Sequence, residues 1–194
     1  MRSIVYLTIL FISMPLLAEV NEDLQSQLIR MAQQNQQVRQ SLEKYNTENV
    51  PPALQTLASQ IDKLQTQTLK EIITLHGWPT NKKVGEKGTQ AAFILVQHSK
   101  NLVFQQDMLP LIIQSFLDKG GIAGKDIAKF TDNVSIRLGK KQVFGTQAKW
   151  SDGKVVFAPI ENEDSVNLLR AQMGMPPLEE YKKSLETFNL QKYR

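Results

Sequence analysis

Two histidines are the side chains of this sequence best suited to acid–base chemistry, because an imidazole titrates near neutral pH. His98 follows Gln97 at the end of an apolar run, residues 89–101, and His76 opens a compact turn. His98 could act as general acid or base on an activated water, with Asp132 orienting it. The alternative is a core histidine that is hydrogen-bonded at the end of a buried helix.

Standard catalytic signatures do not support a particular reaction. The sequence has no nucleophile elbow, no P-loop, no dinucleotide-binding glycine pattern and no His-Glu-x-x-His zinc motif. Two histidines cannot make a three-histidine metal site, and a site completed by Asp107 or Asp132 has no ligand spacing in its favour. We therefore expect neither a metal nor a cofactor.

The first residues have the pattern of a secretory signal peptide. Arg2 precedes an apolar stretch, residues 4–17, and Ala18 is followed by polar residues. We expect a signal peptide at residues 1–18 and a single domain at residues 19–194. An uncleaved N-terminal anchor is the alternative. The chain has no cysteine, which excludes disulfides and fits export to a bacterial periplasm, or secretion.

Composition limits the partners of the mature chain. The full sequence has a net charge of +4, but the lysines are scattered and do not alternate with aromatic residues, so we expect no nucleic-acid partner. No second long apolar run follows the first, so we expect no stable transmembrane segment after cleavage. The remaining candidates are a small molecule or a component of the cell envelope, with the oligomeric state left open.

A long apolar stripe predicts the first helix, over residues 21–45. Its members follow helical spacing: Leu24, Leu28, Met31, Val38, Leu42 and Tyr45. Asn35 interrupts this stripe, so it either sets the register of a helix pair or faces a polar pocket. Arg39 lies one turn later and, as a site residue, would bind an anion or a carboxylate.

Further patterns predict a mainly α (α+β) fold, an irregular helical array with one β-hairpin at about 141–158 packed on it. Gly145 lies within the first expected strand of that hairpin, residues 142–150, and suggests a bulge or a close approach to the backbone, for which a ligand is one candidate. Residues 81–88 read as a loop with two glycines, and Pro110 predicts a kink or restart in the helix that contains it. The other expected helices are 52–76, 89–101, 101–119, 126–138, 164–173 and 177–188.

Several motifs together resemble an uncharacterised bacterial family, a domain of unknown function. The matching segments are residues 36–39 (Gln-x-x-Arg), 76–80 (Gly-Trp-Pro), 92–98 (Gln-His), 131–132 (Thr-Asp), 139–147 (Gly-Thr-Gln), and Arg170, Gly174, Leu178 and Tyr181. Three positions depart from the pattern: Asn35 where an acid is expected, Asn133 where arginine is expected and Phe144 where tyrosine is expected. The resemblance implies no reaction.

The resemblance does point to a set of polar residues that could converge in one pocket or form a buried scaffold. Its members are Gln36, Arg39, His76, Gln97, His98, Gln142, Thr146 and Gln147. We expect either a water-activating hydrolase, in which Arg39 and Gln147 hold an anionic or carbonyl group, or a binding module for a small molecule, peptide or glycan. A third possibility is an adaptor that works through the first two helices.

Overall fold

The computed structural model describes residues 20–45 and 49–192, and the expected signal peptide at residues 1–18 lies outside them. Helices dominate the fold and a single antiparallel hairpin supplies its β structure, which confirms the predicted fold class. None of the helices in the described part of the chain is long and apolar enough to cross a membrane. The helices are α1 (Glu22–Glu43), α2 (Pro52–His76), α3 (Asn81–His98), α4 (Leu102–Leu117), α5 (Gly124–Arg137), α6 (Val166–Gln172) and α7 (Leu178–Lys192).

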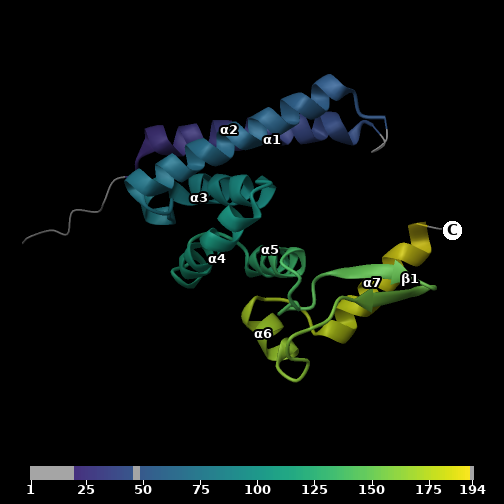
Figure 1. The fold of residues 1–194 in the computed structure, drawn as a ribbon. Coiled ribbons are helices and arrows are strands. Elements are labelled where there is room, and N and C mark those ends of the chain that lie inside the picture. Colours follow the sequence, from purple (N-terminus) through teal and green to yellow (C-terminus); the bar gives the residue numbers. More distant parts are fainter. Residues whose placement is uncertain (1–19, 46–48, 193–194) are drawn as a thin grey trace, which may run out of the picture.

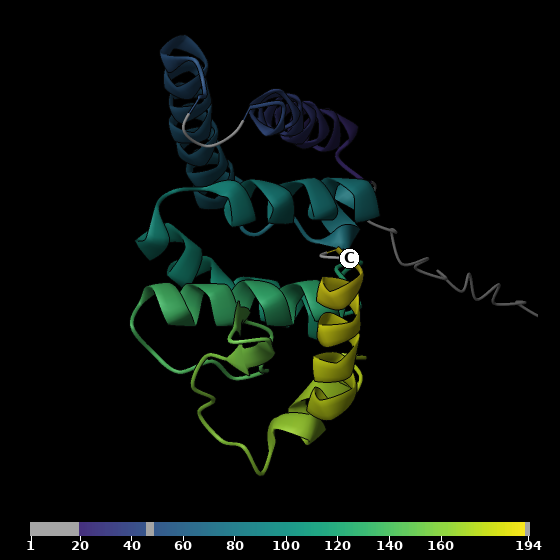
Figure 2. The ribbon, with the colours of Figure 1, turned by 90° about the vertical axis from the view of Figure 1, so that its right-hand side faces the viewer.

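Three tiers make up the molecule (Figure 1). The first tier holds the antiparallel helices α1 and α2, which lie over α3. Helices α4 and α5 form the middle tier. The hairpin, α6 and α7 form the third tier. In Figure 2, α7 stands vertically along the right-hand side of this tier. Leu28, Leu69, Val96, Ile112 and Ile127 are fully buried, so one apolar core runs through the first two tiers.

Helix α3 begins earlier than the sequence suggests. The expected loop at 81–88 belongs to the helix, which is interrupted at Gly85 (φ 65°, ψ 169°). A Cβ at Gly85 would lie 2.5 Å from Nε2 of Gln25, which donates a hydrogen bond to the carbonyl of Val84. The glycine was read as a loop signal, but it permits a kink at which α1 approaches α3.

Helix α4 does not restart at Pro110, which was one of the two outcomes expected there, because it continues through the proline as one element. Proline removes one backbone donor, which leaves the carbonyl four residues earlier, that of Gln106, without its helical partner. Both Pro110 and Gln106 are exposed, so water can satisfy that carbonyl and the helix does not have to restart.

The hairpin is shorter than predicted. Strands β1 (Ala148–Ser151) and β2 (Lys154–Phe157) pair around a turn in which Asp152 and Gly153 have φ of 51° and 75°. This confirms the turn, since both central residues adopt the left-handed conformation. Residues 142–147 were expected to extend the first strand but form a loop, with Gln142 bridged to Ile160. The backbone N–H groups of residues 143, 144, 146 and 147 bond to side chains instead of to a neighbouring strand.

Candidate functional site

A network of five polar side chains joins helices α1, α2 and α3. We call it the helical cluster, and its members are Asn35, Arg39, Asp62, Gln65 and His98. Asn35 is buried and its Nδ2 donates to Oδ1 of Asp62 at 3.0 Å and to Oε1 of Gln65 at 2.9 Å. Asn35 therefore sets the register between α1 and α2. This is one of the two roles that the sequence suggested for a polar residue on an apolar stripe.

The hydrogen bonds of the helical cluster determine which nitrogen of His98 carries the proton. Nε2 of Gln65 donates to the carbonyl of Met31 at 2.8 Å, which orients both the Gln65 and Asn35 amides. Oδ1 of Asn35 then accepts from Nε of Arg39 at 2.9 Å and lies 2.6 Å from Nδ1 of His98. Because an amide oxygen can only accept, neutral His98 is protonated at Nδ1 and its Nε2 keeps a lone pair.

Burial and the positive charge of Arg39 favour the neutral imidazole of His98. Burial, and then the positive charge of Arg39, lower the pKa of His98 from 6.5 to about 4, and Asp62 opposes them weakly. Arg39 also forms an ion pair with Asp62 at 3.1 Å and donates to the carbonyl of His98 at 3.0 Å. The C-terminal end of α3 is thus held to α1 and α2 by charged groups.

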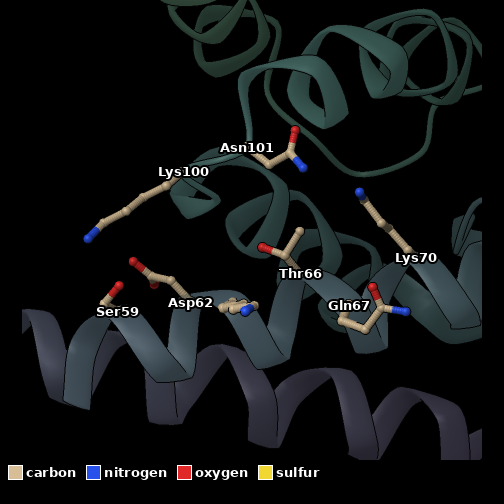
Figure 3. A pocket seen from close by; sticks show the side chains of 8 residues that line it. Ser59, Asp62, Thr66, Gln67, Lys70, Lys100 and Asn101 are labelled. Carbon is tan, nitrogen blue, oxygen red and sulfur yellow. The ribbon is translucent and has the colours of Figure 1, made fainter. Parts of the chain in front are cut away.

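A groove of about 350 Å³ lies beside the helical cluster, between α2 and the turn that joins α3 to α4. We call it the α2 groove. Asp62 belongs to both, so one carboxylate joins the buried network to the surface hollow. Lys100 and Lys70 lie on opposite sides of Thr66 and Asn101 (Figure 3). The lining residues are Ser59, Asp62, Lys63, Thr66, Gln67, Lys70, Lys100 and Asn101.

Asp132 lies elsewhere, at the centre of a second network around residues 142–147. Its carboxylate accepts from the backbone N–H groups of Val143 at 2.7 Å, Phe144 at 3.0 Å and Thr146 at 2.8 Å. The hydroxyl of Thr146 donates to it as well, at 2.9 Å. Asp132 is fully buried and bonded to this loop, so it does not orient His98.

Gln142 and Arg170 complete this second network, which we call the loop cluster: Asp132, Gln142, Thr146 and Arg170. Gln142 donates to the carbonyls of Gln147 and Ala158 at 3.0 and 2.7 Å. Fully buried Arg170 donates to the carbonyls of Phe144 and Pro176, both at 2.7 Å, and its guanidinium lies 4.9 Å from the ring centroid of Tyr181. The loop cluster therefore joins α5, the loop and α6.

The packing of helix α7 explains the glycine at position 145. Its φ is 65°, and a Cβ there would lie 2.7 Å from Cδ1 of Leu178. The close approach expected at this glycine is made by α7.

The residues predicted to form one pocket are placed in separate regions. Arg39 and His98 meet in the helical cluster, whereas Gln142, Thr146 and Gln147 belong to or adjoin the loop around Asp132. Gln36, Gln97 and His76 are exposed, and the carbonyl of His76 accepts from Lys83. The α2 groove is lined by Asp62 of the helical cluster and by no member of the loop cluster.

Sequence reasoning overlooked the residues on α2 that complete the site. Asp62 and Gln65 were passed over because they lie beside the apolar stripe of that helix, yet both are buried. Their spacing of three residues, on the same face as Ala58 and Leu69, was the available signal. The groove lysines carried no signal, because a lysine on a helix is ordinarily a solvated surface residue.

The geometry defines a helical α+β domain with a polar groove and no recognisable catalytic constellation among the described residues. No group of three or more His, Asp or Glu side chains that could hold a metal ion occurs in that part of the chain. A family model, the family of unknown function DUF6624, matches residues 22–192. The chain belongs to this family, as the resemblance of its motifs to a domain of unknown function indicated. No curated protein and no solved structure shows significant similarity to it.

Proposed function

We propose that this protein is an exported binding module that holds a small molecule, peptide or glycan in the α2 groove without turning it over. The observation that carries the proposal is the sharing of Asp62 between the groove and the helical cluster. A carboxylate held by Arg39 and Asn35 gives the groove wall a fixed polar group before any ligand arrives. Such preorganisation lowers the entropic cost of binding.

Hydrolysis by an activated water is supported less well. His98 has a free lone pair at Nε2, to which no hydrogen bond from a described residue is directed. Its pKa of about 4 makes it a weak base at neutral pH, whereas an efficient general base titrates near the working pH. Asp132, the expected orienting group, is bonded to the loop at 142–147.

An adaptor role has one observation in its favour. Leu57, Leu64 and Leu75 are 47%, 67% and 77% exposed, and their spacing places them on one face of α2. The face that bears Ser59 and Thr66 is about half a turn away, so a partner on the leucines would leave the groove open. The stripe of α1, in contrast, is buried at Leu24 and Leu28.

Ligand-dependent thermal stability tests the proposal. The protein would be purified in its exported form, which we propose begins at Glu19. Intact-mass spectrometry would identify its first residue. A bound ligand at one hundred times its Kd should raise the melting temperature by about 5–10 °C. Ser59→Trp, which fills the groove, should abolish the rise, whereas Gln60→Trp, at the next exposed position but off the groove, should retain it.

Other outcomes separate the alternatives. A ligand that is cleaved during the assay, as seen by mass spectrometry, would favour hydrolysis over simple binding. A melting temperature that rises with protein concentration but with no ligand would favour the adaptor. Equal responses of the two tryptophan variants would place the ligand outside the α2 groove and contradict the proposal.

A further inference from the structure

The charged side chains that line the α2 groove are unequal in sign. Lys63, Lys70 and Lys100 are basic, and Asp62 is the single acid among the described residues that line it. The charge of Asp62 is already balanced by Arg39 at 3.1 Å. No ion pair within the described residues neutralises any of the three lysines. The groove therefore carries uncompensated positive charge.

Two of these polar groups are held in place by their neighbours. The ammonium group of Lys70 lies 5.2 Å from the ring centroid of Phe104, a cation–π contact that limits where this long side chain points. Oδ1 of Asn101 accepts from the backbone N–H of Phe104 at 2.9 Å and so caps α4. The Nδ2 of Asn101 is thereby turned toward the α2 side of the groove, as Figure 3 shows.

The uncompensated charge of the groove is carried by hydrogen-bond donors, whereas Gln67 and the charge-balanced Asp62 supply acceptor oxygens. A lysine ammonium can only donate, and the exposed nitrogen of Asn101 donates as well. The hydroxyl of Thr66 donates to Ser99 at 2.8 Å, which fixes its own orientation. A matching ligand must be rich in acceptors and negatively charged, because donors that face a neutral or cationic group gain little.

We propose, building on the binding function above, that the α2 groove selects a small oxyanion: a phosphate- or carboxylate-bearing molecule about the size of a sugar. Lys63, Lys70 and Lys100 supply the charge, and the amide of Asn101 supplies a directed donor. The volume of about 350 Å³ suits a small molecule better than a long polymer. Phosphate and carboxylate share the chemistry that such a site recognises.

Calorimetric titration at low salt tests the inference with glucose 6-phosphate, glucuronate, inorganic phosphate and glucose. At least one of the three anions should bind, and glucose should not. The rank of phosphate and carboxylate ligands then identifies which oxyanion the site prefers. Raising the salt concentration should weaken binding, since Lys63 and Lys100 are exposed to solvent and screened by ions.

Charge-removing variants supply the matched comparison. Lys63→Gln combined with Lys100→Gln should lower the affinity for the preferred anion about tenfold. Lys140→Gln combined with Lys141→Gln removes the same charge from exposed positions outside the groove and should change affinity less than twofold.

The failures of the two proposals are distinguishable. Binding of glucose as tight as that of its phosphate, lost in Ser59→Trp but unaffected by the lysine changes, would overturn anion selection and leave the binding function intact. Anion binding that both double variants weaken equally would reflect net charge and overturn the assignment to this groove. Binding of none of the four compounds would overturn anion selection. The binding function would then be tested by comparing the two tryptophan variants in melts with peptides and neutral glycans.

Discussion

The helical cluster and the loop cluster each tie three segments of the chain together through buried polar groups, but they differ in whether any of those groups borders a groove. In the loop cluster, Asp132 accepts from three backbone N–H groups and one hydroxyl, and Gln142 uses both ends of its amide. Nη2 of Arg170 has no hydrogen-bond partner among the described residues, but it is buried. In the helical cluster, His98 keeps a lone pair at Nε2, and Asp62 reaches the α2 groove.

This difference separates scaffold from candidate site. A buried polar group whose bonds are all made within the protein stabilises the fold and has little capacity left for a ligand. A polar group that is held in position yet borders a hollow is arranged for recognition. Three changes, given from the largest expected effect to the smallest, test whether the comparison holds.

Asp132→Asn should be the most damaging change. The amide replaces one acceptor oxygen with a donor group that faces backbone N–H groups of Phe144 or Thr146, so buried donors lose their partner. We expect the free energy of unfolding to fall by about 3 kcal/mol or more, measured by urea denaturation. Asp107→Asn, at an exposed position of α4, is the control. A loss of less than about 0.5 kcal/mol would show that Asp132 is not a scaffold residue.

Asn35→Asp should alter both the stability and the electrostatics of the helical cluster. The new carboxylate replaces the amide donor 3.0 Å from Asp62 and 2.9 Å from the oxygen of Gln65, so we expect a loss of about 1–3 kcal/mol. Its negative charge next to Nδ1 should raise the pKa of His98 from about 4.

Proton NMR can follow this pKa directly, since the chain has two histidines and exposed His76 serves as the reference in the same sample. Asn35→Ala removes the amide without adding charge and separates the two effects. A His98 that titrates alike in the wild type and in Asn35→Asp would refute the hydrogen bond between these residues.

His98→Asn should have the smallest effect and should appear mainly in the pH dependence of stability. The pKa of His98 lies near 4 in the folded protein and near 6.5 in the unfolded chain, so below pH 6.5 the unfolded chain takes up a proton that the folded protein does not. The stabilisation from neutral His98 is therefore complete above pH 6.5 and lost as the pH falls towards 4.

Because His98 is only partly shielded from water, we expect the loss to be about 1–2 kcal/mol, less than the full pKa shift would imply. The asparagine amide can occupy the position of Nδ1 and donate to Asn35 without titrating. Melting curves at pH 7 and pH 4.5 should therefore differ less for His98→Asn than for the wild type. Equal differences would mean that His98 is already charged in the folded protein.

Local patterns in the sequence were sufficient for most of the fold. The apolar spacing from Leu24 to Leu42 predicted α1, and the Asp152–Gly153 turn predicted the hairpin. Both signals depend on residues close together in the chain, where helical periodicity and backbone conformation are decided. The errors were the loop expected at Gly85, where α1 approaches a kinked helix, the restart expected at Pro110, and the strand expected at 142–147, which forms a loop.

The sequence by itself determined that this chain folds as a helical array with one hairpin, that it lacks cysteine, and that Asn35 is an exception on an apolar face. Only the tertiary structure decided which polar groups meet. Asn35 contacts Asp62 and His98 across 27 and 63 residues, and Asp132 turns to a loop instead of to His98. Side-chain hydrogen bonds act over about 3 Å, so partners far apart in sequence are chosen by how the helices pack.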